Sequence, residues 1–315
     1  MNRNHNIAKL AAIAVLSIAM LSGCRELPGK EAADNQLEQR LSGNTQQETA
    51  ETFKQGIAEV TSNVEQAVQN TAAKVTEEIK SGSMSKELVT SRKAGSFSAI
   101  VLNNSVGEVK ITSGSSDSVT VKATVVTHLG LNQETERKIL DNAEVTVQAD
   151  GDELKVSTHA KNEPKKDLWA WAQKKYGSSN FTIDYEIEVP AAIDEYHISN
   201  DVGAIHLQEL QGTFDISSNV GSILIDNAQF SGKSTVKSNT GSIELDIRAM
   251  KAGSSLKAHS DIGKVIADLD SSLKCTVSAK SELGQITGTG AGKTDIKGGG
   301  PLLSLSTQIG SITVQ

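Results

Sequence analysis

Ser217-Ser218-Asn219-Val220-Gly221-Ser222-Ile223 is the stretch of sequence that decides the fold. Two variants of it follow, Ser238-Asn239-Thr240-Gly241-Ser242-Ile243 and Gln308-Ile309-Gly310-Ser311-Ile312. In each, a glycine stands two residues before an isoleucine, inside a run in which apolar and polar residues alternate. Alternation with a period of two is typical of half-buried strands, and glycine is the usual residue at tight corners. The phrase therefore predicts a strand, a glycine corner and a second strand.

Aligning the chain on this glycine reveals seven copies of one unit, which we call a coil. A β-branched residue stands two positions after every glycine, an apolar residue five positions before it, and Asn, Ser or Thr three positions before it. Successive glycines from Gly203 onward are 18, 20, 22, 21 and 26 residues apart. The aligned glycines, here called the ladder glycines, are Gly107, Gly203, Gly221, Gly241, Gly263, Gly284 and Gly310.

One coil of about 20 residues is too small to bury its apolar face alone, so the coils must stack. Stacking predicts an all-β fold, a β-solenoid, with aliphatic ladders inside. The Asn, Ser and Thr column is expected to hydrogen-bond the corner backbone. Only 10 of 315 residues are aromatic, which favours a narrow interior with little room for rings.

The short repeat lapses in the 96 residues between Gly107 and Gly203. Strand patterns persist there, with alternation over 119–125 and again over 181–189, ending at Pro190. We expect a looser, partly antiparallel region that leads into the coils.

The N-terminus carries an export signal over residues 1–23. An apolar run from Leu10 to Leu21, too short to span about 30 Å of hydrocarbon, is followed by Leu21-Ser22-Gly23-Cys24. That ending resembles the lipobox of bacterial lipoproteins, which implies lipid on Cys24, cleavage just before it, and attachment to a membrane. The alternative is an ordinary secretory signal with an incidental cysteine.

Residues 24–47 are polar and predict a flexible tether. Residues 48–80 predict a long amphipathic helix, because apolar side chains recur there at alternating steps of four and three. Two interpretations stay open, a coiled coil and a helix packed on the following domain. The seam consists of Phe53, Ile57, Val60, Val64, Ala67, Thr71, Val75 and Ile79.

Residues 94–315 resemble a known bacterial family, the "putative adhesin" domain of β-strand-repeat lipoproteins, whose function is unknown. The likeness rests on the three coil phrases and on Glu188-Val189-Pro190 just before the coils. It implies a right-handed β-helix-like fold and a role in the cell envelope, in some members beside stress-response systems. It supplies no catalytic residues.

Composition and motifs argue against several functions. The net charge is −7, and −9 once residues 1–23 are removed, so nucleic acid is an unsuitable partner. Nucleotide binding is also excluded, because the glycine-rich segment 288–294 has Thr287 where a P-loop needs its first glycine. Cys275 alternates with polar residues as a buried strand residue does.

No catalytic, cofactor or metal site is expected. The histidines neither share a helical spacing nor align across coils, which a zinc site would require. If the coils stack in chain order, Asp261 and Glu282 lie on adjacent coils, where two carboxylates alone make a weak calcium site. Asp201 and Asp261 then lie three coils apart, about 14 Å, too far for a paired acid and base.

An aromatic segment offers a candidate contact surface. Trp169, Trp171 and Tyr176 stand close together, with Lys165, Lys166, Lys174 and Lys175 around them. The rings either cap an open end of the coil stack or touch a partner.

Together these features predict a non-catalytic lipoprotein, anchored by Cys24 on the extracytoplasmic face of a cell membrane. As an adhesin or scaffold it would present a rigid solenoid surface to a membrane protein or an envelope polymer. The alternatives are an accessory role in envelope-stress signalling and, less favoured, an enzyme acting on envelope glycans. Deletion of residues 48–80 separates the first two, because signalling should fail while polymer binding survives.

Overall fold

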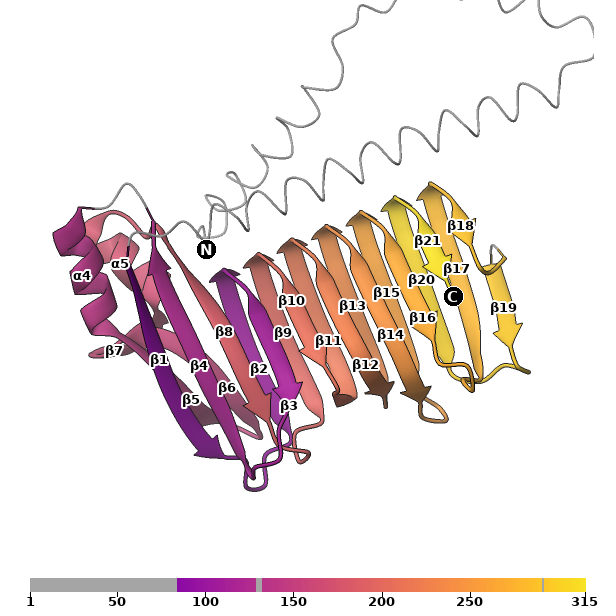
Figure 1. The fold of residues 1–315 in the computed structure, drawn as a ribbon, viewed down its shortest axis with the longest axis horizontal. Helices are drawn as coiled ribbons and strands as arrows, with labels where there is room; N and C mark the ends of the chain where they lie inside the picture. The colour runs from indigo at the N-terminus through magenta and orange to yellow at the C-terminus, as the bar shows by residue number, and fades with distance from the viewer. Residues whose placement is uncertain (1–83, 129–131, 291) are drawn as a thin grey trace, which may run out of the picture. The chain divides into compact units, whose positions relative to one another are not determined.

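The computed structural model describes residues 84–128, 132–290 and 292–315, which belong to one compact unit. This part of the chain is all-β, with 21 strands and two short helices (Figure 1). No helix within it is long and apolar enough to span a membrane. The predicted signal, the tether, the helix over 48–80 and Cys24 lie outside the described residues.

The strands form one hydrogen-bonded network of two long ladders, here called sheet A and sheet B. Each coil contributes one strand to each sheet, and the ladder glycine lies at the corner between them. Across sheet A the strands are β1 (Met84–Lys93), β4 (Ser118–Thr127), β8 (Phe181–Val189), β3 (Val109–Ser113), β10 (Ile205–Gln208), β12 (Ile223–Phe230), β14 (Ile243–Met250), β16 (Val265–Leu269), β21 (Ile312–Val314) and β18 (Ile286–Thr287).

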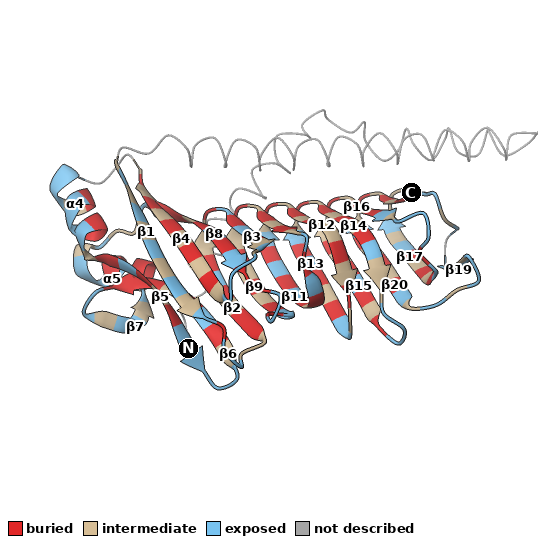
Figure 2. Ribbon diagram, turned by 60° about the horizontal axis from the view of Figure 1, so that its bottom comes forward, coloured by how far each residue is buried: buried red, intermediate tan, exposed pale blue. Residues whose placement is uncertain are grey.

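Sheet B runs beside it in the matching order. Its strands are β5 (Ala143–Asp150), β6 (Glu153–Ala160), β2 (Ala99–Val106), β9 (Glu195–Val202), β11 (Gln211–Val220), β13 (Lys233–Thr240), β15 (Ser255–Ile262), β20 (Leu302–Ile309), β17 (Cys275–Leu283) and β19 (Gly292–Ile296). Pairing is parallel throughout the coils, from β2 to β17. Buried and exposed residues alternate along these strands, so the core lies between the sheets (Figure 2).

The last coil departs from chain order. Strand β20 pairs with β15 on one side and with β17 on the other, so the Gly310 coil lies between the Gly263 coil and the Gly284 coil. The prediction that Asp261 and Glu282 occupy adjacent coils is therefore wrong. Strand β19 covers the outer edge of β17 in antiparallel pairing, which protects an edge that would otherwise attract another chain.

Close backbone contact at the corners explains the ladder glycines. At Gly203, φ is +127°, and a Cβ atom would lie 2.0 Å from the carbonyl oxygen of Gly107 in the coil below. No side chain fits there. The ladder also records the order of the coils, since Gly310 meets the carbonyl of Gly263 and Gly284 meets that of Gly310.

Five of the seven residues in the small polar column donate to backbone carbonyls at the corners, as predicted, whereas the hydroxyls of Ser218 and Ser238 are buried with no hydrogen-bond partner in the described part of the chain. Asn200 Nδ2 donates to the carbonyl of Gly107 at 2.9 Å, and Thr307 Oγ1 donates to that of Gly263 at 3.0 Å. Ser260 and Ser281 donate to the carbonyls of Gly241 and Gly310, both at 2.9 Å. These bonds satisfy carbonyls that the turn would otherwise leave buried and unpaired.

Aromatic rings do enter the coils, contrary to the prediction of a narrow interior. Tyr196 and Phe214 stack at 5.0 Å between ring centroids, and Phe230 packs on Phe214 at 4.9 Å. All three are buried. Tyr196 and Phe214 occupy the same position in successive coils, and the small Ser234 takes that position in the next one. A large residue is thus balanced by a small one further along the same ladder.

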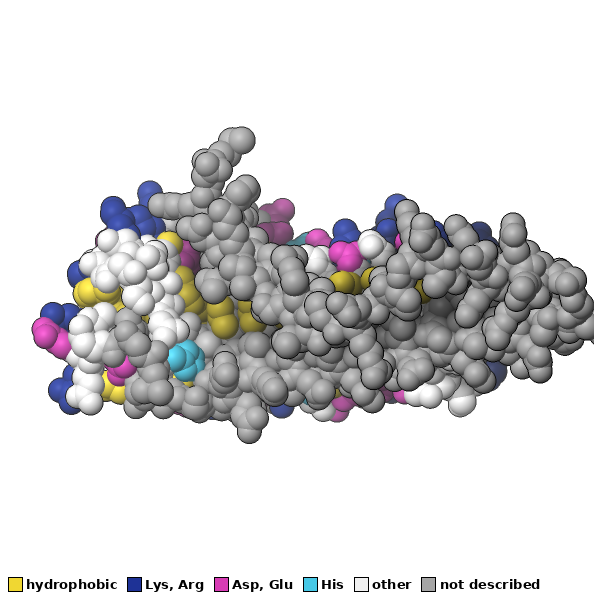
Figure 3. Space-filling model, turned by 90° about the horizontal axis from the view of Figure 1, so that it is seen from above, with side chains coloured by type: hydrophobic (Ala, Val, Ile, Leu, Met, Phe, Trp, Pro, Cys, Tyr) yellow, Lys and Arg dark blue, Asp and Glu magenta, His cyan; other side chains and the backbone are white. Residues whose placement is uncertain are grey.

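The predicted antiparallel region closes the N-terminal end. Strand β4 pairs antiparallel with β1 and β8, and β5 pairs antiparallel with β6. The edge strands β1 and β5 approach each other, with Arg92 donating to the carbonyl of Val147 at 3.2 Å. Strand β7 (Glu163–Asp167) and helices α4 (Gln133–Asn142) and α5 (Leu168–Tyr176) complete this end. Seen from above, hydrophobic side chains show there between basic ones (Figure 3).

Candidate functional site

The outer face of sheet A is interrupted by a bulge in β12. Between Ile225 and Ala228 the register to β14 shifts, so that Asp226 and Asn227 stand opposite Asp246 alone. Asn227 has φ +52°, in the left-handed region that asparagine tolerates better than most residues. The extra residue bends the strand and re-aims the side chains around it.

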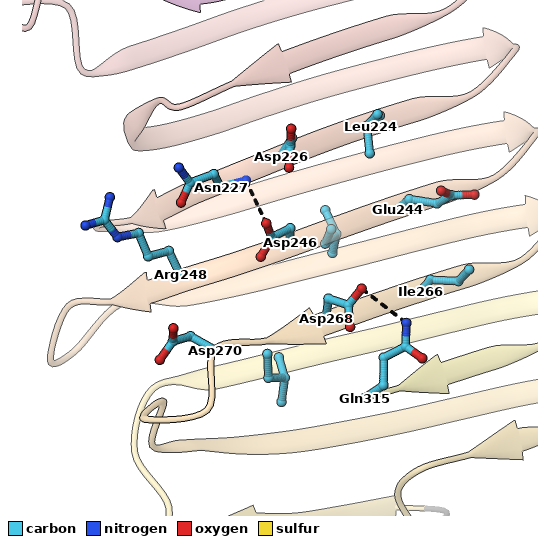
Figure 4. A pocket seen from close by; sticks show the side chains of 12 residues that line it. Leu224, Asp226, Asn227, Glu244, Asp246, Arg248, Ile266, Asp268, Asp270 and Gln315 are labelled. Carbon is cyan, nitrogen blue, oxygen red and sulfur yellow. Dashed lines mark hydrogen bonds between the residues drawn. The ribbon is translucent and has the colours of Figure 1, made fainter.

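A pocket of about 630 Å³, here called the acidic pocket, lies beside this bulge (Figure 4). It spans β12, β14 and β16 and reaches Gln315, which follows β21. A second hollow of about 260 Å³ adjoins it, because Asn227 and Arg248 line both. The acidic pocket is lined by Leu224, Asp226, Asn227, Glu244, Leu245, Asp246, Arg248, Ile266, Asp268, Leu269, Asp270 and Gln315.

Three aspartates form a row along the pocket. Asp226, Asp246 and Asp268 each stand five residues after a ladder glycine, and Asp246 is the register partner of Asp268. Adjacent strands are about 4.8 Å apart, so the row repeats a carboxylate at roughly that interval. Two of these carboxylates accept a hydrogen bond from another residue of the pocket. The backbone N–H of Asn227 donates to Asp246 Oδ2 at 3.2 Å, and Gln315 Nε2 donates to Asp268 Oδ2 at 3.1 Å.

The charge of the pocket is strongly negative. Its lining holds five carboxylates, those of the row together with Glu244 and Asp270, against the guanidinium of Arg248. Glu244 is paired at the margin with Lys264 at 2.9 Å. The hydroxyl and amide of Ser272 hold the pKa of Asp270 below its usual range, with Lys297 and Arg248 adding to the effect. Such a surface attracts cationic groups and repels anionic ones.

The pocket presents carboxylate and amide oxygens beside the apolar side chains of Leu224 and Ile266. This combination can bind a cationic group that carries an apolar stem. Across the described residues, no group of three or more His, Cys, Asp or Glu is placed to hold a metal ion.

Of the predicted contact residues, Trp169 and Trp171 are buried in α5 at the N-terminal end. Trp169 stacks on Phe181 at 5.4 Å and donates its indole N–H to the Phe181 carbonyl at 3.1 Å. Trp171 meets Tyr176 edge-on at 5.5 Å, and Lys175 lies over the Trp171 ring. The exposed fractions are 8% for Trp169 and 5% for Trp171, and Tyr176 is half-buried. Contact of these rings with a partner stays a prediction.

Other predicted residues take clear positions. Cys275 is buried in β17, as expected, and burial raises the pKa of its thiol. Asp261 accepts a hydrogen bond from Gln308, whose Nε2 lies 2.9 Å from Asp261 Oδ1. Gln308 belongs to the Gly310 coil, here called the inserted coil because it lies between the Gly263 and Gly284 coils. The glycine-rich segment leads into β19, a strand, where a phosphate-binding loop would lead into a helix.

A short amide ladder runs along the corner of sheet B. Asn239 donates to Asn219 at 3.0 Å, and Asn219 donates to Asp201 Oδ1 at 2.7 Å. Burial raises the pKa of Asp201, and the bond from Asn219 offsets part of this increase. Folding therefore penalises the ionised form of Asp201.

Asp201→Asn is expected to stabilise the protein at pH 7 and not at pH 3. A raised pKa in the folded state means that stability is highest below the unfolded pKa, about 3.9, and falls as the pH rises through the folded value. The variant removes that fall and extends the amide ladder, for a gain below about 1 kcal/mol, since Asp201 is only half-buried. Urea unfolding at both pH values measures the difference. Asp152→Asn, in an exposed turn, is the matched control, and an equal gain in both variants would contradict the assignment.

The sequence analysis did not identify the row of three aspartates, although the sequence contains a signal for it. Once the chain is aligned on the ladder glycines, the column five residues after them contains Asp226, Asp246 and Asp268. The signal was available as a run of like charges in consecutive coils, whereas the bulge that opens the pocket carries no obvious sequence signature.

Comparison with known proteins gives structural likenesses only. No protein-family model matches the chain, and no curated protein matches it. Among solved structures, the chain is similar to a "putative cell adhesion protein" from Clostridium sporogenes, with a TM-score of 0.40 and 12% identity over 73% of this chain and 99% of that one. It is also similar to a "putative adhesin" from Bacteroides fragilis, with a TM-score of 0.34 and 17% identity over 73% and 97% of the two chains.

Proposed function

We propose that this protein is an adhesin-like lipoprotein of the cell envelope, and that its acidic pocket binds a basic segment of a partner protein. In this account the coils form a right-handed β-solenoid that holds the pocket rigid, and lipid on Cys24 keeps the protein on the extracytoplasmic face of the membrane.

The observation that carries the proposal is the row of three aspartates beside the β12 bulge. Fixed on neighbouring strands, these carboxylates need little reorganisation on binding, which reduces the entropic cost of association. Same-face side chains of an extended segment recur about every 6.6 Å, and lysine and arginine side chains are long and flexible enough to reach carboxylates about 4.8 Å apart. Leu224 and Ile266 add apolar surface for the aliphatic stems of those side chains. An acidic envelope polymer fits this charge poorly.

The test is photo-crosslinking in intact cells from a photoreactive residue at position 224. We expect a protein adduct that falls at least fivefold when Asp226, Asp246 and Asp268 are all changed to Asn. The matched control places the photoreactive residue at Lys237, exposed in β13 on the opposite sheet. Adducts to glycan alone, or the same protein captured equally from both positions, would overturn the proposal.

Lipid attachment has its own test. Cys24→Ala is expected to abolish labelling by radioactive palmitate, because the variant lacks the thiol that carries the lipid. Cys275→Ala is the control and should remain labelled, since Cys275 is buried. Persistent labelling of the Cys24→Ala protein would contradict the lipobox assignment.

A further inference from the structure

The inserted coil creates a row of reactive side chains on the outer face of sheet B, opposite the acidic pocket. Ser306 in β20 is the register partner of His259 in β15 and of Lys280 in β17. Had the coils stacked in chain order, His259 and Ser306 would be separated by a strand. Their meeting is a direct consequence of the order Gly263, Gly310, Gly284.

Hydrogen bonds connect Ser306, His259 and Asp261, which stands two residues after His259 in β15. His259 Nδ1 lies 2.8 Å from Ser306 Oγ, and His259 Nε2 lies 2.9 Å from Asp261 Oδ1. A carboxylate only accepts hydrogen bonds, so in the neutral imidazole the ring hydrogen sits on Nε2, and Nδ1 keeps a lone pair for the serine hydroxyl. The second acceptor near Ser306, the Ala258 carbonyl, is farther away at 3.5 Å.

The carboxylate is itself held in place. Gln308 Nε2 donates to Asp261 Oδ1 at 2.9 Å, which fixes the group that orients the imidazole. His259 and Asp261 expose 29% and 41% of their side chains, so the row is open to solvent and to an incoming molecule. On the far side of Ser306, Lys280 adds a positive charge on the neighbouring strand, with its ammonium 3.5 Å from Glu282.

We propose that Ser306 is a nucleophile that accepts acyl groups from carboxylic esters, a role beyond the proposed binding function. Ser306 Oγ attacks the ester carbonyl carbon, and its proton passes to His259 Nδ1 while Asp261 stabilises the imidazolium through Nε2–H. The carbon–alkoxide bond then breaks, and the alcohol leaves with the proton from Nδ1. Water releases the acyl group by the same proton transfers.

The arrangement differs in one respect from the usual Ser-His-Asp order, because the two ring nitrogens exchange roles. The proton path is unaffected, since either nitrogen can accept a proton while the other donates to the carboxylate. The open face suits an ester carried on an extended polymer, which can lie along the strands.

The experiment uses a fluorophosphonate probe on the full-length protein, with the labelled residue identified by mass spectrometry. The probe forms an Oγ–P bond and releases fluoride. We expect Ser306 to be labelled, Ser306→Ala to abolish the label, and His259→Gln to slow it about 100-fold, the usual loss when a general base is removed. A circular dichroism melt checks that each variant is folded.

Ser304→Ala is the matched control. Ser304 lies two residues earlier on the same face of β20 and is equally half-buried, but its register partners are Lys257 and Ser278, and no histidine adjoins it. Its removal should leave the label unchanged. The proposal is overturned by absence of label on the folded protein, by equal label on Ser304 and Ser306, or by a rate that His259→Gln does not alter.

Discussion

Gly241→Ala is expected to be among the most damaging single substitutions in the coils, lowering the free energy of unfolding by about 3 kcal/mol or more. The residue has φ +148°, and a Cβ atom there would lie 1.8 Å from the carbonyl oxygen of Gly221. The new atom must displace backbone that is itself held by the next coil. Backbone strain and overpacking each cost about 1–3 kcal/mol, and here they act together. Urea denaturation followed by circular dichroism measures the loss.

Gly253→Ala separates the two contributions. Gly253 also has positive φ, +79°, but an added Cβ would meet nothing within 4 Å. The substitution Gly253→Ala should therefore lower the free energy of unfolding only by the conformational penalty of about 1–2 kcal/mol. If both variants lose the same stability, the tight packing of the glycine ladder is not what holds the coils together.

Phe214→Ala is expected to cost about 3–5 kcal/mol, the range for truncating a buried phenylalanine. Its ring lies between Tyr196 and Phe230 and is fully buried, so the substitution leaves a cavity inside the coil stack and removes two ring contacts. Thermal unfolding should show a shift of many degrees. Phe97→Ala is the control, because Phe97 is only partly buried, under the guanidinium of Arg92, and should cost roughly 1 kcal/mol. Equal losses would mean that the stacked rings are not central to the core.

The local structure of a coil was predictable because each position has one physical role. The β-branched column enters the core, most residues of the Asn, Ser and Thr column bond the corner carbonyls, and the glycine admits the neighbouring backbone. These roles depend on side chains close in sequence. They do not depend on which coil lies above or below, so the order of the coils was not determined by them.

The position of the last coil shows this limit. The Gly284 and Gly310 units satisfy the same columns, with Ser281 matching Thr307 and Leu283 matching Ile309. Either could stack on the Gly263 coil as far as the pattern is concerned. The observed order is a matter of long-range pairing, in which β19 turns back along one edge of β17 and β20 lies between β15 and the other edge of β17.

Both candidate sites depend on the order of the coils, which the repeat pattern does not determine. The aspartates of the acidic pocket could be found by column, but the contribution of Gln315 requires β21 to lie beside β16. The row of His259, Ser306 and Lys280 could not be found at all, because chain-order stacking separates the histidine from the serine. The first strand, β1, was likewise missed, since it pairs with β4 far along the chain and has little apolar pattern of its own.

The most direct test of this account is therefore the order of the coils, measured by cysteine crosslinking. In the double variant Lys257→Cys and Ser304→Cys, the two positions are register partners on adjacent strands, about 4.8 Å apart, within the range that a disulfide spans. In the variant Lys257→Cys and Ser278→Cys, a strand lies between them, at about twice that separation, beyond disulfide reach. Oxidation should link the first pair and leave the second unlinked. A disulfide in the second pair and none in the first would show that the coils stack in chain order, contradicting both the inserted coil and the serine site built on it.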